Sequence, residues 1–98
     1  MGVFRLTHDA KASMMGIARY TQQNWGVKQR NTYMRLIDDC FHALAISPMQ
    51  GKSRLEIHHA LRSYPVEKHV VFYMMKKDYI VIVNVLHKHM DPDKNLRL

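Results

Sequence analysis

Residues 70–86 read VVFYMMKKDYIVIVNVL, and this stretch decides the fold. It contains two runs of β-branched and aromatic residues, which is the composition typical of β-strands. Its only charged residues stand together between the two runs, at Lys76, Lys77 and Asp78. We therefore predict a β-hairpin with its turn at these three residues.

The second arm of this hairpin has two largely apolar faces. Strict alternation along a strand gives one set of Tyr79, Val81, Val83 and Val85, and an opposite set of Ile80, Ile82, Asn84 and Leu86. A strand that is apolar on both sides is typical of the centre of a sheet that helices cover on at least one side. We expect the N-terminal half of the chain to pack on this hairpin.

The N-terminal half predicts a strand and then a helix. Residues 2–6 are short and alternating, which is consistent with a first strand that joins the sheet. Thr7 offers a hydroxyl as a helix N-cap, and Asp9 places a negative charge in the first turn, where the helix dipole favours it. The apolar stripe of this helix runs to Trp25, and Gly26 occupies the position of a C-terminal cap.

A second helix follows almost at once and ends at Ser47-Pro48, since proline disfavours a helical residue before it. Its apolar face carries Met34, Ile37, Phe41 and Leu44. So short a connection between the helices predicts an antiparallel helix hairpin. Gly16, inside the first helix, costs about 1 kcal/mol relative to alanine, so we expect it to mark close packing against a neighbour.

The remaining segments complete an α+β domain. Residues 54–60 fit either a turn of helix or extended chain, and Leu61–Tyr64 read as a strand that Pro65 confines to an edge or to its end. The polar tail 91–98 is expected to be partly flexible. We predict one domain over residues 1–98, with an N-terminal strand and an antiparallel two-helix hairpin packed on a mostly antiparallel sheet of about four strands.

The charge of the chain favours an anionic partner. Fifteen Lys and Arg against eight Asp and Glu leave a formal charge of +7, in a composition that is otherwise ordinary for a globular protein. Nucleic acid and an acidic protein segment both fit this balance, and a basic surface that serves only solubility is the plainer interpretation. Charge alone does not distinguish among them.

The basic residues of the second half form a candidate patch around Tyr64. They are Lys52, Arg54, Arg62, Lys68, Lys88, Lys94 and Arg97. On a shared face these side chains would contact phosphates or carboxylates.

Cys40 is the only cysteine, which excludes an intrachain disulfide and a zinc site built from cysteines. Its place in an amphipathic helix predicts a buried packing residue in a reducing compartment. The apolar run at residues 1–6 is too short for a signal peptide, and no stretch reaches the roughly 18 apolar residues of a membrane span. We expect a cytoplasmic protein without a membrane partner.

The histidines are the residues that could suggest metal or acid-base chemistry. They include His58, His59, His69, His87 and His89. A zinc site needs three or four ligands of defined spacing, and no such motif occurs around these positions. We therefore predict neither a metal nor another cofactor, and expect these histidines at strand ends and on a basic surface.

A metal-free ribonuclease is a second chemical possibility. It needs a base for the 2′-hydroxyl, an acid for the leaving oxygen and cations near the phosphate. Convergence of Arg62, His69, His87, Lys88 and Lys94 across the sheet would supply these groups. The simpler interpretation is that the three cationic residues are solvated charges bordering a sheet.

Three short signatures also stand out in the chain. They are Tyr-Thr-x-x-x-Trp-Gly at residues 20–26, His-Val-x-Phe-Tyr at 69–73 and Val-Leu-His-x-x-Met-Asp at 85–91. With Leu44–Pro48 and the order of strand, helix hairpin and three strands, they resemble the ParE/RelE superfamily of bacterial toxin-antitoxin toxins. The resemblance covers nearly the whole chain, and the three signatures together are specific for the ParE branch.

The resemblance implies one of two toxic activities. ParE-like members poison DNA gyrase by blocking supercoiling and trapping cleaved DNA, whereas RelE-like relatives cut messenger RNA in the ribosome. RelE-like toxins carry several Lys and Arg on the sheet and an Arg or Tyr near the C-terminus. The approximately matching places here hold His69, Lys88 and Lys94, with Met90 and Asp91 nearby.

An aspartate beside a scissile phosphate would oppose its charge, so the resemblance implies a gyrase poison that is not an enzyme. A ribosome-dependent endoribonuclease is the first alternative. An inactive homologue that only binds its antitoxin is the second.

The implied partners are DNA gyrase and a ParD-like antitoxin whose flexible C-terminal region wraps the toxin, with DNA reached only through these two proteins. We expect the antitoxin in an apolar groove between helix hairpin and sheet, lined by Met14, Ile17, Trp25, Phe41 and Tyr73. We expect target contact at the basic C-terminal edge, through Arg62, Lys88, His89, Lys94 and Arg97.

Overall fold

The computed structural model describes residues 2–98 and has the predicted order of strand, helix hairpin and strands. Its elements are β1 (Phe4–Leu6), α1 (His8–Trp25), α2 (Val27–Ile46), the 3-10 helix η1 (Pro48–Gln50), β2 (Lys52–Ser53), β3 (Leu61–Val66), β4 (His69–Met75), β5 (Ile80–His87) and α3 (Pro92–Asn95). The α+β class is confirmed. Neither α1 nor α2, nor any other helix in residues 2–98, is long and apolar enough to cross a membrane.

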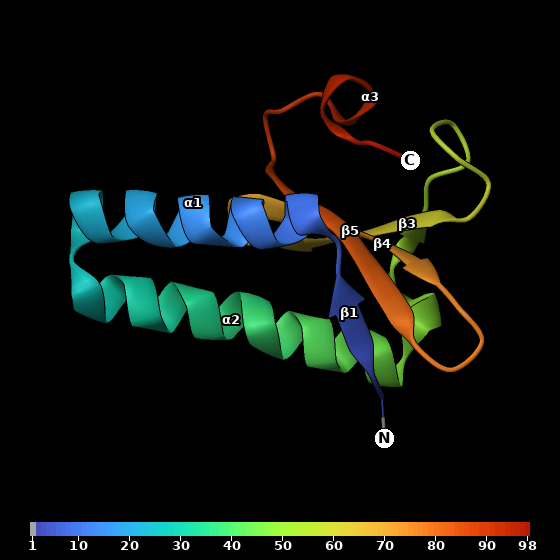
Figure 1. Ribbon diagram of the computed structural model, residues 1–98, viewed down its shortest axis with the longest axis horizontal. Helices are drawn as coiled ribbons and strands as arrows, with labels where there is room; N and C mark the ends of the chain where they lie inside the picture. The colour runs from blue at the N-terminus through green and yellow to red at the C-terminus, as the bar shows by residue number, and fades with distance from the viewer. Residues whose placement is uncertain (1) are drawn as a thin grey trace.

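The five strands form one sheet in the order β1-β5-β4-β3-β2. β1 runs parallel to β5, and every other pairing is antiparallel. The sheet has five strands where the sequence predicted about four, because β2 consists of two exposed polar residues without a strand signal. Figure 1 shows the helix hairpin crossing the sheet and extending well past it, so that the turn between the helices lies away from the strands.

The central hairpin forms as predicted, with its turn at residues 76–79 closed by a hydrogen bond from Lys76 N–H to the Tyr79 carbonyl (2.8 Å). Strict alternation along β5 is wrong, however. Tyr73 pairs with Ile82 and the preceding Phe72 pairs with Asn84, so Val83 is the extra residue of a β-bulge.

The bulge changes which β5 side chains share a face. Ile80, Ile82 and Val85 all belong to the core beneath the helices, whereas Val83 and Leu86 belong to a second cluster. The sequence alone gave no signal for this shift, because every one of these residues is apolar.

Two cores result, one on each side of the sheet. The helices supply Ala10, Ile37, Phe41 and Leu44 to the larger core. The smaller cluster, built from Leu61, Phe72, Val83 and Leu86, is covered by Ile57 from the loop before β3 and by Leu96 from the tail. The tail thus contributes to the second core, and it contains the short helix α3, for which the sequence predicted no element.

The predicted helix signals can be read directly in the structure. The Thr7 hydroxyl oxygen accepts a hydrogen bond from Ala10 N–H (3.0 Å) and donates to the Val83 carbonyl (2.7 Å), so this N-cap also ties α1 to β5. Gly26 joins α1 to α2 with φ +92°, a conformation that disfavours any side chain. Gly16 does not mark close packing, because a Cβ at this position would meet nothing within 4 Å.

Pro65 and Cys40 lie where the sequence predicted them. Pro65 belongs to β3 but falls beyond Arg62 and Ser63, which pair with β2, so it occupies a stretch of β3 without a second neighbour strand. Cys40 is half-buried against the helix-side core, and burial raises the pKa of its thiol to about 11. It is a packing residue and not a nucleophile.

Candidate functional site

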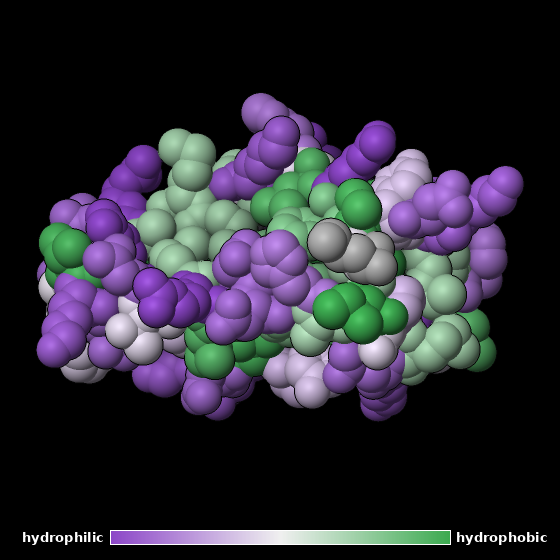
Figure 2. All heavy atoms as spheres, turned by 90° about the horizontal axis from the view of Figure 1, so that it is seen from below, coloured by the Kyte–Doolittle hydropathy of each residue, from purple (hydrophilic) through white to green (hydrophobic). Residues whose placement is uncertain are grey.

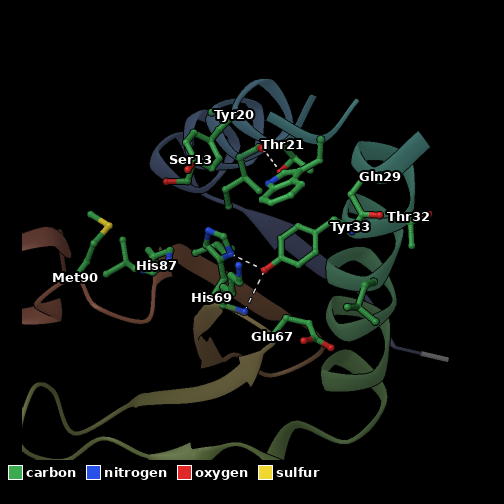
Figure 3. Close-up of a pocket in the computed structure, with 17 residues that line it drawn as sticks. Ser13, Tyr20, Thr21, Gln29, Thr32, Tyr33, Glu67, His69, His87 and Met90 are labelled. Atoms are coloured by element: carbon green, nitrogen blue, oxygen red, sulfur yellow. Dashed lines mark hydrogen bonds between the residues drawn. The ribbon is translucent and has the colours of Figure 1, made fainter. Parts of the chain in front are cut away.

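A groove of about 900 Å³ lies between the helix hairpin, the β3–β4 turn and the end of β5. It is lined by Ser13, Gly16, Ile17, Tyr20, Thr21, Trp25, Gln29, Thr32, Tyr33, Leu36, Glu67, Lys68, His69, Val85, Leu86, His87 and Met90. Figure 3 shows Tyr20 and Thr21 on the α1 side, Gln29 and Thr32 on the α2 side, and Tyr33, His69 and His87 between the helices and the sheet. Residues far apart in the sequence therefore share one recess.

The helix walls of the groove expose large apolar side chains. Trp25 is 67% exposed, Tyr20 is 65% exposed, and Leu36 is exposed on the facing helix. They are uncovered because the helix hairpin extends past the sheet (Figure 1). Such a cluster around a recess is typical of a surface that binds another protein.

The face of the molecule seen from below is more mixed. In the view of Figure 2, hydrophilic atoms in purple are interspersed with smaller groups of hydrophobic atoms in green. Scattered apolar side chains of this kind are normal for a soluble domain.

The floor of the groove carries the polar rings of Tyr33, His69 and His87. The Tyr33 hydroxyl lies 2.7 Å from His69 Nδ1, and it accepts a hydrogen bond from Lys68 N–H (3.3 Å). His69 pairs across the strands with His87, with ring centroids 5.4 Å apart. Burial, aided by His87, lowers the pKa of His69 to about 4, so this imidazole is neutral at pH 7. The floor therefore offers hydrogen-bond partners, next to the charged residues Glu67 and Lys68, which also line the groove.

The structure divides the predicted groove residues into two groups. Ile17 and Trp25 line the groove. Phe41 and Tyr73 are only 2% and 0% exposed and belong to the core, so expecting them on the groove surface was wrong. Met14 packs against the same core. Periodicity identifies the apolar side of a helix, but it does not show which part of that side the sheet covers.

The residues that sequence reasoning missed are Tyr20, Tyr33, Leu36 and His69. The sequence suggests His69 as a strand-end histidine or a nuclease group, but nothing in it places His69 or Tyr33 in a groove. Their shared role depends on β4 approaching α2, a contact between residues 36 positions apart. The one local indication in the sequence was the presence of two aromatic residues, Tyr20 and Trp25, near the end of the first helix.

Arg62 does not belong to an exposed basic edge. Its Nη2 donates to the Gly51 carbonyl (2.7 Å) and to the Met49 carbonyl (3.1 Å), and its Nε is buried. The guanidinium therefore holds the loop after α2 against the sheet. These contacts set Arg62 apart from the other residues predicted to contact a target, since the sequence shows its charge but not its partners.

The other four predicted target-binding residues lie along the last segment of the chain. The backbone of Lys88 hydrogen-bonds the Lys68 carbonyl (2.8 Å), at the opposite end of β3 from Arg62. His89 follows, and its N–H donates to His87 Nδ1 (3.2 Å). Lys94 and Arg97 line a small polar pocket over the start of α1, where Arg97 Nε lies 3.4 Å from Asp9 Oδ2. The structure thus places Lys88 beside His89, and Lys94 beside Arg97 in one pocket. Arg62 lies apart from both pairs.

The groups of a metal-free ribonuclease do not converge. His69 and His87 are adjacent, but Arg62 is engaged with backbone carbonyls elsewhere and Lys94 lies beside the start of α1. Within residues 2–98 no three His, Cys, Asp or Glu side chains are placed to hold a metal ion. What the arrangement does provide is an apolar, hydrogen-bonding recess that can take side chains of a protein segment.

Comparisons with known proteins agree with this geometry. A family model described as the ParE toxin of type II toxin-antitoxin system, parDE, matches residues 4–92. Toxin ParE of Escherichia coli is 33% identical over 92 residues, 93% of this chain and 89% of the relative. Toxin ParE1 of Caulobacter vibrioides is 31% identical over 96 residues, 98% of this chain and 99% of the relative.

A solved structure, described as the chromosomal ParDE TA system from P. aeruginosa, contains a chain of the same fold. It has a TM-score of 0.76 and 18% sequence identity, and the match covers 89% of this chain and 96% of the other. The strand, helix hairpin and sheet found here are therefore a known arrangement.

Proposed function

This chain belongs to the ParE toxin family of type II toxin-antitoxin systems, and on that premise we propose that it stops growth by inhibiting DNA gyrase. It blocks supercoiling and traps the cleaved DNA, without cutting nucleic acid itself. The observation that carries the proposal is the family match over residues 4–92, which includes the groove and, at the C-terminal edge, Lys88 and His89. Gyrase acts in the bacterial cytoplasm, so we place the protein there.

The chemistry of the described residues favours a binding function over a nuclease. A general base works best with a pKa near the operating pH, whereas burial lowers the pKa of His69 to about 4. The cation that a phosphorane would need from β3 is Arg62, and its guanidinium is occupied by the carbonyls of Met49 and Gly51. Both groups act instead in hydrogen bonds that hold the fold.

We propose that a ParD-like antitoxin neutralises the toxin by laying an amphipathic segment in the groove. The exposed rings of Tyr20 and Trp25 offer apolar anchors, and the floor at Tyr33 and His69 offers hydrogen-bond partners. The net charge of +7 favours an acidic segment and speeds its approach. Operator binding by such a complex would be a property of the antitoxin.

We place gyrase contact on the C-terminal segment that carries Lys88, His89, Lys94 and Arg97. Arg62 is left out because its guanidinium is directed to backbone carbonyls. The segment lies next to the groove at its start, since Met90 lines it. An antitoxin in the groove would therefore lie close to the proposed gyrase contact.

The test adds the purified chain to gyrase with relaxed plasmid, and separately to translating ribosomes with messenger RNA. We expect lost supercoiling and accumulated linear DNA, with intact messenger. Codon-phased RNA cuts with unaffected gyrase would overturn the proposal in favour of a nuclease. Antitoxin binding without either effect would identify a homologue that only binds its partner.

A pair of charge variants locates the gyrase contact. The double change Lys88→Ala and Lys94→Ala should reduce gyrase inhibition at least about tenfold, whereas Lys76→Ala with Lys77→Ala should leave it within twofold. The control pair removes the same charge from the β4–β5 turn, outside the proposed segment. Equal inhibition by both double variants would exclude the C-terminal segment.

A further inference from the structure

Gly16 is the one glycine of four that nothing inside the chain requires. At Gly2 a Cβ would collide with the backbone at the end of α2, and at Gly51 it would collide with the Tyr73 ring. Gly26 has a positive φ of +92°. Gly16 lies within α1 without a positive φ, and a Cβ built on it meets nothing within 4 Å.

A glycine at this place is unfavourable for the free protein. An interior helix position is destabilised by glycine relative to alanine, because glycine loses more backbone entropy on folding. Since neither backbone conformation nor internal packing accounts for Gly16, its purpose must lie on the side that faces outward. That side is the groove, which Gly16 lines.

Gly16 interrupts the α1 wall between larger side chains. Residues three and four apart lie next to each other along a helix face, which makes Ser13 and Tyr20 its neighbours on the groove side, and both line the groove as well. The missing side chain leaves a notch in the wall beside the exposed Tyr20 ring. It also lets an opposing side chain reach the helix backbone closely.

We propose that Gly16 is a specificity-determining residue of the groove, and that its notch receives a large apolar side chain from the antitoxin segment. The inference rests on the proposed neutralisation by a ParD-like antitoxin. It adds that Gly16 is the position on α1 that recognises this partner. Leu36 on the opposite wall and the exposed Tyr20 ring beside the notch make it suited to an apolar group. The chain's charge of +7 favours an acidic partner over a second copy of itself.

The test compares Gly16→Ala, Gly16→Leu and the control Ala12→Leu in the full-length chain. Ala12 is exposed on the same helix, one turn before Gly16, and lines the small polar pocket beside the tail instead of the groove. Affinity for the antitoxin encoded beside the toxin is measured by calorimetry, and the melting temperature of each free variant is measured alongside. The control adds the same isobutyl group to α1 just outside the groove lining.

Stability and affinity should change in opposite directions. Gly16→Ala should melt about 4 °C or more above the wild type, with affinity reduced by no more than about threefold. Gly16→Leu should be at least as stable as the wild type and bind the antitoxin at least about tenfold more weakly. Ala12→Leu should bind within twofold of the wild type.

Three results would each contradict a different statement. Wild-type affinity in Gly16→Leu would overturn the notch while leaving neutralisation by the antitoxin intact. No antitoxin binding by the wild-type chain would overturn the proposed function and this inference with it. A concentration-dependent dimer that Gly16→Leu abolishes would assign the notch to a second copy of this chain and overturn the stated occupant.

Discussion

Two tyrosines connect the helix hairpin to the sheet, at opposite ends of α2, and they do so in different surroundings. The Tyr73 hydroxyl, on β4, donates to the Pro48 carbonyl (2.7 Å) and accepts from Gly51 N–H (3.0 Å), and its ring is fully buried. The Tyr33 hydroxyl, on α2, meets His69 at 2.7 Å in a groove open to solvent. The first contact is closed by the chain itself, and the second leaves room for a partner.

This difference separates stability from recognition. Where Tyr73 and Arg62 hydrogen-bond the backbone of the loop after α2, the chain itself supplies the partners of these backbone groups, and the loop is held against the sheet. Where Tyr33 lies, the helices extend past the sheet and leave Tyr20 and Trp25 uncovered. Substitutions at the Tyr73 end should therefore change stability, and substitutions at the Tyr33 end should change binding.

The largest stability effect is expected at the closed end. Tyr73→Phe removes the partner of Gly51 N–H and of the Pro48 carbonyl inside the protein, which should cost about 2–3 kcal/mol and lower the melting temperature by roughly 10 °C or more. Thermal denaturation followed by circular dichroism measures this change. At 15 °C, where the variant stays folded, its antitoxin affinity should equal that of the wild type. A variant with unchanged melting and weakened binding would reverse the roles of the two ends.

The next effect concerns affinity at the open end. Trp25→Ala should weaken antitoxin binding by about 10- to 30-fold, or about 1.4–2 kcal/mol, while changing the free energy of unfolding by less than about 0.5 kcal/mol. The stability is kept because the ring is 67% exposed. Met15→Ala is the matched control, since Met15 is 65% exposed on the same helix and does not line the groove. Equal losses in both variants would point to a general loss of apolar surface instead of the groove.

The third effect appears when the pH is lowered. His69 has a folded-state pKa of about 4 because of burial, below the ordinary value of 6.5. The unfolded chain therefore binds the extra proton first, and stability is lost as the pH falls from about 6.5 towards 4. Because the ring is only half-buried, we expect a contribution of about 1 kcal/mol. Urea midpoints at pH 7 and pH 5 should differ less in His69→Gln than in the wild type, and equal differences would contradict the assignment.

The smallest effect is expected from Tyr33→Phe. Water in the open groove can replace the lost hydroxyl, so the free energy of unfolding should fall by only about 0.5 kcal/mol. Tyr33→Phe should therefore lower the free energy of unfolding much less than Tyr73→Phe does. If urea denaturation gave equal losses for Tyr33→Phe and Tyr73→Phe, the distinction between a closed and an open end would not hold.

Local chemistry was enough to predict most of the fold. The hydroxyl of Thr7, the glycine at position 26 and the charged turn at residues 76–78 each act within a few residues of themselves, and each lies where the sequence indicated. The bulge at Val83 escaped prediction because both faces of β5 are apolar. A periodic pattern cannot report a shift in a strand where Asn84 is the only polar residue before His87.

The site was harder to predict because its contacts are distant in sequence. In the sequence Arg62 looks like a free surface cation. Its partners are the carbonyls of Gly51 and Met49, which lie 11 and 13 positions away and cannot be inferred from spacing. Phe41 and Tyr73 read as groove residues because the pattern cannot show where the sheet ends beneath the helices. A glycine at position 16 was correctly expected to cost stability inside a helix. The expected close packing is absent, because a Cβ at this position would meet nothing within 4 Å.

The most direct measurement of the central claim uses Trp25, the only tryptophan of the chain. Its ring lines the groove and is largely exposed, so its fluorescence reports whether that surface is covered. The toxin is titrated with an antitoxin in which any tryptophan is replaced by phenylalanine, while calorimetry follows binding in parallel. We expect the emission to shift to shorter wavelength and to saturate together with the heat. Saturating heat with unchanged emission would show that the antitoxin binds outside the groove.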